Sequence, residues 1–174
     1  MKLKQLVFTG CLFAGLAIAS CSKSDNKNLN NTDMDFLLKT SAGNTAEIDA
    51  ATLASYKATN VAVRNFAQHM LMEHGMAQTD LKNVAASVGF PVKDSLDPAH
   101  IAIKAQLESL NGRQYDSAYI YVQVTDHQTT IANFNTELSN GQHKDVKNYA
   151  SNYLPHIQMH LQSADSISKA YFPR

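Results

Sequence analysis

Helical periodicity governs the chain from Thr32 onward. Apolar residues recur there at three- and four-residue spacing in four long segments, with polar residues between them. No segment shows the strict apolar and polar alternation of a half-buried strand. The sequence therefore predicts an all-α fold.

Capping and turn residues divide this region into helices. The Thr32-Asp33 pair is predicted to cap the first helix, Asn60 the second, and Asp97-Pro98 a short helix inside a crossover over residues 90–112. The predicted helices span about residues 33–58, 60–88, 98–111, 113–139 and 143–170. Short joints within two helix pairs and a long connection between them predict a four-helix bundle with a long crossover between helices 2 and 3.

The N-terminal segment MKLKQLVFTGCLFAGLAIASC has the order of a secretory signal. Two lysines precede an apolar run that ends at Ala19 and is too short to span a membrane. The end of the run, Ile18-Ala19-Ser20-Cys21, resembles the lipobox of bacterial lipoproteins, in which the peptide is cut before the Cys and that Cys is acylated. The alternative is a plain secreted protein with an incidental Cys21.

This interpretation divides the chain into three parts. Residues 1–20 are a lipoprotein signal peptide that is removed, residues 21–31 are the acylated Cys21 (the expected site of palmitate) and a polar tether, and residues 32–174 are the bundle domain. Ser22, where an Asp would favour the inner membrane, predicts an outer membrane lipoprotein that faces the periplasm. The membrane is thus an expected partner through the lipid at Cys21.

Charge and cysteine content exclude several functions. The chain has 15 Lys and Arg against 15 Asp and Glu, so nothing attracts nucleic acid or an anionic lipid surface. Cys11 leaves with the signal and Cys21 carries lipid, which removes thiol catalysis, thiolate zinc sites and disulfides. No nucleophile elbow or phosphate-binding Gly loop is visible, so an enzyme is the least supported class.

Three histidines fall on the inward seams of three different helices. The three-four spacing places His74 in the second helix, His127 in the third long helix and His160 in the last one on these seams. The first helix contributes Glu47 in the corresponding register. All four residues lie within about one turn of their helix midpoints. The sequence predicts that they share one level of the bundle.

Other polar residues accompany this layer. Glu73 and Asp126 each precede a seam histidine, so they flank the layer and are candidates for orienting a histidine or for ligands. His156 lies one turn before His160 on the same face and is a third candidate for these roles. The remaining histidines are expected outside the layer: His69 near the flank, His100 exposed in the crossover and His143 solvated at the start of the last helix.

Four ordered motifs resemble one family over nearly the whole mature domain. They are Phe66-Ala67 and Met70 with Glu73-His74, LNGRQYDSAY from Leu110 to Tyr119, Asp126-His127, and YLPHIQMHLQSA from Tyr153 to Ala164. They look like domain of unknown function 4142, whose members are secreted or lipoprotein bundles related to the ferritin-like fold. The resemblance thus implies a ferritin-like bundle whose recurrent polar residues match the layer.

The chain departs from that family's pattern at three places. Glu73 replaces the more usual Asp, Gln123 stands where Met is preferred, and Ser41-Ala42-Gly43 follows the small-residue stretch only loosely. The Glu-x-x-His motif of ferritin-like di-iron enzymes is absent, since Glu73 and His74 are adjacent. Ferroxidase and oxygenase activity are therefore not carried over.

Two hypotheses for the layer remain open. In the first, His74, His127, His160 and Glu47 bind a transition metal ion such as zinc, iron or copper. In the second, the layer is only a hydrogen-bond network inside a structural or protein-interaction module that binds another envelope protein. Nearby thioethers would suit copper, although such side chains more often fill a core; they belong to Met70, Met72, Met76 and Met159.

Overall fold

The computed structural model describes residues 28–173, which form five α-helices and no strand. The helices are α1 (Asn31–Lys57), α2 (Val61–Ser87), α3 (Pro98–Ser109), α4 (Gly112–Asn140) and α5 (Lys144–Tyr171). The predicted all-α class is confirmed. The signal peptide, Cys21 and the tether up to residue 27 lie outside the described residues.

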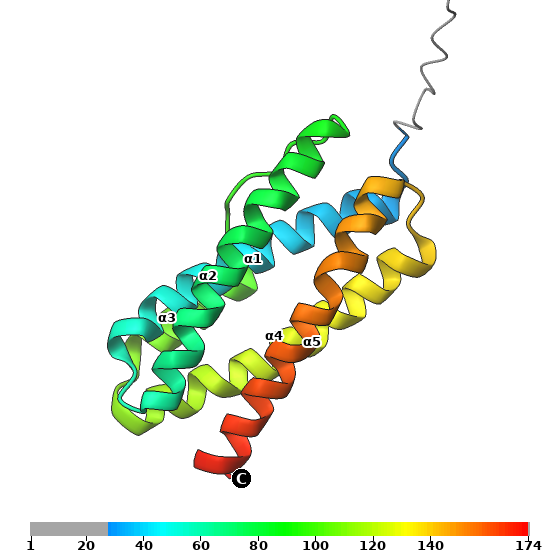
Figure 1. The fold of residues 1–174 in the computed structure, drawn as a ribbon. Coiled ribbons are helices and arrows are strands. Elements are labelled where there is room, and N and C mark those ends of the chain that lie inside the picture. The colour runs from blue at the N-terminus through cyan, green and yellow to red at the C-terminus, as the bar shows by residue number, and fades with distance from the viewer. Residues whose placement is uncertain (1–27, 174) are drawn as a thin grey trace, which may run out of the picture.

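The four long helices pack as two hairpins (Figure 1). Short turns join α1 to α2 and α4 to α5, so the helices of each pair are antiparallel. α1 of the first hairpin contacts α4 of the second, and α2 contacts α5. The short helix α3 lies in the crossover and packs on α1 and α4. Four helices thus surround one common interior, as the lengths of the connections predicted.

Helix starts follow the predicted caps with one correction. Asn60 and Asp97 are N-caps, and Pro98 occupies the first turn of α3. The predicted Thr32-Asp33 cap is wrong, because Asn30 caps α1. Its side chain accepts from the Asp33 backbone N–H at 2.8 Å, and the Asp33 carboxylate accepts from the Asn30 N–H at 2.7 Å. This reciprocal capping box satisfies two free backbone N–H donors, and the helix begins earlier in the chain than predicted, at Asn31.

Two other expectations are corrected by burial. From sequence, Gly43 and Asn44 are expected to be a weak point of the first helix. α1 instead runs unbroken through both, and the buried Asn44 amide donates to Gln78 and to the Tyr149 hydroxyl, each at 3.3 Å. His143 is not solvated: only 5% of its surface is exposed. It caps α5 by accepting, through Nδ1, the Asp145 backbone N–H at 3.2 Å.

Buried carboxylates fasten both ends of the bundle. Asp33, at the start of α1, accepts the backbone N–H groups of Gln142 and His143, each at 3.0 Å, from the turn between α4 and α5. Asp116 of α4 does the same for the turn between α1 and α2. It accepts from the Thr59 N–H at 3.0 Å, the Asn60 N–H at 2.9 Å and the Thr59 hydroxyl at 2.5 Å. These contacts fix the axial register of one hairpin against the other.

The apolar core is divided by a polar layer. One cluster includes Phe66, Met70 and Tyr119 and lies toward the turn between α1 and α2. The other includes Phe36 and Phe134 and lies toward the turn between α4 and α5. Between the two clusters every long helix buries polar groups, and these are Asn44, Glu47, His74, Gln123, His127 and His160.

No helix among residues 28–173 combines the length and the apolar character that a membrane span requires.

We predict that Asp116→Ala destabilises the fold by about 2 kcal/mol, because two partly buried backbone N–H groups of the turn between α1 and α2 lose their acceptor. Urea unfolding of the purified domain measures the change. Asp35→Ala is the matched control, since the Asp35 side chain is 68% exposed and forms an ion pair with the exposed Lys39, and it should change stability by less than about 0.5 kcal/mol. Equal effects of the two variants would contradict the proposed role of Asp116.

Candidate metal centre

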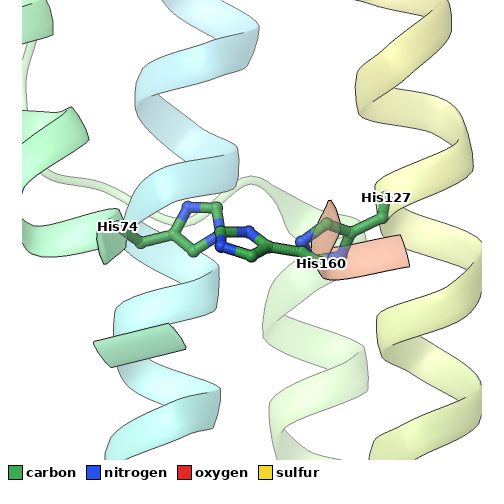
Figure 2. A group of neighbouring side chains, drawn as sticks. All are labelled: His74, His127 and His160. Carbon is green, nitrogen blue, oxygen red and sulfur yellow. The ribbon is translucent and has the colours of Figure 1, made fainter. Parts of the chain in front are cut away.

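Three buried imidazoles from three helices meet at the centre of the bundle (Figure 2). His74 comes from α2, His127 from α4 and His160 from α5, and each is at most 3% exposed. Their ring centroids are 5.3 to 5.7 Å apart. One nitrogen of each ring lies within 4.8 Å of the corresponding nitrogens of the other two. These seam histidines therefore converge, as the sequence predicted. They are called the histidine triad below.

The outer nitrogen of each triad histidine has an acceptor. His74 Nδ1 is 3.0 Å from Asn44 Oδ1, and His127 Nδ1 is 2.8 Å from the Gln123 backbone carbonyl. His160 Nε2 is 2.9 Å from Glu73 Oε2. A carbonyl or carboxylate oxygen only accepts, so each of these ring nitrogens donates its N–H. The tautomer of every ring is thereby fixed.

The inner nitrogens are left with lone pairs. His74 Nε2, His127 Nε2 and His160 Nδ1 are buried and have no hydrogen-bond partner within residues 28–173. A buried polar atom without a partner costs free energy. Three neighbouring imidazoles thus each keep one buried lone pair free, and such lone pairs are what a metal ion needs from its ligands.

Burial also keeps the triad neutral. Desolvation, together with the neighbouring triad rings, lowers the pKa of His74 well below 6.5 and that of His127 to about 3. The pKa of His160 is lowered by desolvation too, against the raising effect of Glu73. Neutral imidazole is the form that binds a metal ion. At neutral pH the triad is therefore ready to coordinate one.

Glu73 lies directly behind His160, on the side away from the triad. Its Oε2 accepts from His160 and also lies 3.2 Å from His156 Nδ1, while its Oε1 lies 3.4 Å from His69 Nε2. The three imidazoles lower the pKa of this carboxyl, although partial burial opposes them. A carboxylate that accepts the outer N–H of a coordinating histidine orients the ring and increases its basicity. Glu73 has this position toward His160.

Glu47 lies behind His127 and not among the inner nitrogens. Its Oε1 is 3.6 Å from His127 Nδ1, and its Oε2 accepts from the Gln123 side-chain amide at 2.7 Å. Burial raises the pKa of Glu47 to about 8, and the hydrogen bond from the Gln123 side-chain amide opposes this shift. α1 also supplies Asn44, so it contributes two residues to the layer and none to the group of three facing nitrogens.

A cavity of about 170 Å³ between α1 and α4 reaches the layer from the surface. His74, His127 and Glu47 form its inner wall, and Asp126 and His100 form part of its outer wall. Asp126 makes no hydrogen bond to a triad ring within the described part of the chain. Burial raises its pKa, while His100 lowers it. Asp126 therefore lines an approach to the triad instead of supporting one of its rings.

The sequence did not identify every contributor. Asn44 lies three residues before Glu47 in the same register of the first helix, and its polarity at an inward position was the available signal. Gln123 supports His127 with its main-chain carbonyl, one helical turn earlier. Every residue has such a carbonyl, so this contact cannot be predicted from the residue type. The i, i+4 pair His69 and Glu73 was visible as a spacing, but its link to His160 depends on how α2 faces α5.

The comparisons agree with the fold and name a family. The protein-family model described as "Domain of unknown function (DUF4142)" matches residues 19–167 of the chain. The crystal structure of a DUF305 fragment from Deinococcus radiodurans superposes with a TM-score of 0.70 at 14% identity, and the match covers 80% of this chain and 96% of that chain. CopM in an Ag-bound form gives a TM-score of 0.67 at 13% identity, with 81% of this chain and 98% of that chain covered. No curated protein matches the chain.

Glu47 should make stability depend on pH. A carboxyl with a pKa of about 8 in the fold and 4.5 in the unfolded chain binds a proton more tightly when folded, so stability falls as pH rises through this window. Glu47→Gln keeps the acceptor for Gln123 and removes the titration. We predict that the parent loses about 3 kcal/mol relative to Glu47→Gln between pH 5.5 and 8.5.

Urea unfolding at the two pH values measures this difference, and the exposed Glu108→Gln variant is the matched control. A parent and a Glu47→Gln variant that change in parallel would show that Glu47 ionises normally in the fold.

Proposed function

The chain belongs to the DUF4142 family, and we propose that it is an envelope-anchored lipoprotein that binds a transition metal ion through His74, His127 and His160. The observation that carries this proposal is the set of three buried, partnerless nitrogens that face one another while the opposite nitrogens donate to fixed acceptors. Imidazole nitrogen lies about 2.0 Å from bound zinc, which puts coordinating nitrogens about 3.5 Å apart. The nitrogens of the triad lie within 4.8 Å of one another, so the rings would have to move closer by about 1 Å to bind an ion together.

The charge of the site favours a monovalent ion among the candidates zinc, iron and copper. All three donors are neutral, and the cost of burying an ion rises steeply with its charge. Glu73 supplies one negative charge behind His160, whereas Glu47 has a pKa of about 8 and is mostly protonated at pH 7. One carboxylate balances Cu⁺. The Ag-bound form of the structural neighbour CopM supports the same class, because Ag⁺ is also a soft monovalent ion.

The anchor is proposed from the sequence. The lipobox-like Ile18-Ala19-Ser20-Cys21 supports cleavage before Cys21 and acylation there, and Ser22 supports the outer membrane, facing the periplasm. α1 begins at Asn31, so about ten residues separate the lipid from the first helix. This spacing supports a bundle held close to the membrane surface. The ferritin-like relationship implied by the family resemblance is likewise part of this proposal.

The competing function is a structural or protein-interaction module in which the layer is only a hydrogen-bond network. A network of that kind satisfies its buried polar atoms, as Asn44, Gln78 and Tyr149 do beside the triad. The inner nitrogens of the triad depart from this pattern. They favour the metal hypothesis over the purely structural one.

We predict that purified protein without an affinity tag binds Cu⁺ at the triad and is stabilised by it. At a free Cu⁺ concentration of 100 times Kd, the free energy of unfolding should rise by about 2.7 kcal/mol. His74→Ala and His127→Leu should abolish this stabilisation. Metal content after dialysis and thermal unfolding with and without Cu⁺ or Zn²⁺ measure both effects.

His127→Leu also separates loss of binding from loss of folding. Leu removes a buried lone pair and retains side-chain volume, so the metal-free variant should be no less stable than the metal-free parent. His100→Ala, outside the triad, is the control and should retain the metal-dependent stabilisation. A metal-free parent whose unfolding is indifferent to Cu⁺, Zn²⁺ and chelator would exclude the metal function.

We predict that Cys21→Ala abolishes membrane fractionation of the mature protein, since a lipid at Cys21 is its proposed membrane anchor. Separation of membranes from soluble periplasm, followed by immunoblotting, measures the distribution. Cys11→Ala is the matched control, because Cys11 lies in the peptide that is removed. Unchanged fractionation of Cys21→Ala would refute the anchor.

A further inference from the structure

Glu73 is the centre of a second cluster of imidazoles, on the outward side of His160. His160 Nε2 and His156 Nδ1 lie 2.9 and 3.2 Å from its Oε2, and His69 Nε2 lies 3.4 Å from its Oε1. Ligand atoms of His69, Glu73 and His160 lie within 4.8 Å of one another. This cluster lies on the opposite side of His160 from the histidine triad, and His160 belongs to both groups.

Helix geometry explains why these side chains meet. His69 and Glu73 are an i, i+4 pair on α2, and His156 and His160 are an i, i+4 pair on α5. Each pair therefore lies on one helix face, and the packing of α2 against α5 brings the two faces together. Three imidazoles from two helices thus converge on one carboxylate.

The cluster extends from solvent to the buried triad. The side chains of His69 and His156 are 49% and 47% exposed, Glu73 is 18% exposed and His160 is 3% exposed. The His160 ring presents Nε2 to this cluster and Nδ1 to the triad. A single imidazole therefore separates a solvent-accessible group of ligands from the buried one.

Thioethers line the surface beside this cluster. Met72, Met76, Glu73 and His156 share the wall of one open depression between α2 and α5. Met72 is 57% exposed and Met76 is 54% exposed, so neither packs in the core. Exposed methionines have no packing role to explain them, and thioether sulfur is a ligand for soft ions such as Cu⁺. The depression adds soft donors to the imidazoles and the carboxylate.

We propose that the Glu73 carboxylate, with His69 beside one oxygen and His156 beside the other, forms a solvent-facing capture site at which either imidazole joins the carboxylate in binding a soft metal ion, Cu⁺, which passes from there to the triad beside His160. The transfer half of this inference rests on the proposed metal function of the triad. The step is an exchange of ligands in which the ion keeps its charge and no electron is transferred. When the ion binds beside Glu73, the proton that His156 Nδ1 donates to the carboxylate is released to solvent and Nε2 takes one up, so that Nδ1 offers its lone pair. The capture site is the weaker of the two, because solvent competes for its ligands.

The variant that tests the capture site replaces both exposed imidazoles, His69→Ala with His156→Ala. Both side chains are about half exposed, so the free energy of unfolding of the metal-free protein should change little. Titration of the purified full chain with Cu⁺ against a coloured Cu⁺ chelator measures stoichiometry and affinity. We expect two ions per chain in the parent and one, tightly bound, in the double variant.

Stopped-flow mixing with the Cu⁺–chelator complex measures loading of the triad. The double variant should load at least tenfold more slowly than the parent, while His100→Ala, on the cavity between α1 and α4, should load at the parental rate. Slow loading in His100→Ala together with normal loading in the double variant would overturn the inference, because the ion would then enter between α1 and α4.

The triad variant keeps the two proposals distinguishable. If His127→Leu retains one weakly held ion and the double variant retains one tightly held ion, both sites stand. If only the double variant loses an ion, the capture site stands and the triad function fails. If the parent binds a single ion that only His127→Leu removes, the triad function stands and the capture site is overturned.

Discussion

The site depends on the desolvation of three imidazoles. Burial holds His74, His127 and His160 neutral, with the pKa of His127 lowered to about 3. A neutral ring has one donor and one acceptor, so the outer hydrogen bond of each ring determines which nitrogen faces inward. Asn44, Gln123 and Glu73 provide those three bonds. The facing lone pairs are thus a consequence of burial combined with three acceptors placed behind the rings.

The level of the layer is set at the ends of the bundle. Asp33 ties α1 to the turn between α4 and α5, and Asp116 ties α4 to the turn between α1 and α2. A helix that slides by one residue advances 1.5 Å and rotates its side chains by about 100°. Such a slip would remove a histidine from the layer altogether. The two buried carboxylates therefore matter for the site even though neither lies near it.

Periodicity was sufficient to predict the layer, because the inward face of each helix can be read from that helix's own sequence. His74, His127 and His160 could be placed inward without any knowledge of their neighbours, and all three are buried. The atoms that face one another could not be predicted, since the tautomer of His127 depends on a main-chain carbonyl. The burial of His143 was missed for a related reason: its partner Asp33 lies 110 residues away in sequence.

The different environments of Glu47 and Glu73 determine where the layer carries negative charge. Glu73 receives N–H donors from His160 and His156 and has a lowered pKa, so it stays ionised. Glu47 has one amide donor in a fully buried position, and its pKa rises to about 8. The carboxylate charge beside the triad is therefore concentrated on the side that faces solvent and α5. An ion that approaches from that side meets a negative charge before it meets neutral rings, and the attraction is strongest at the outward end of His160.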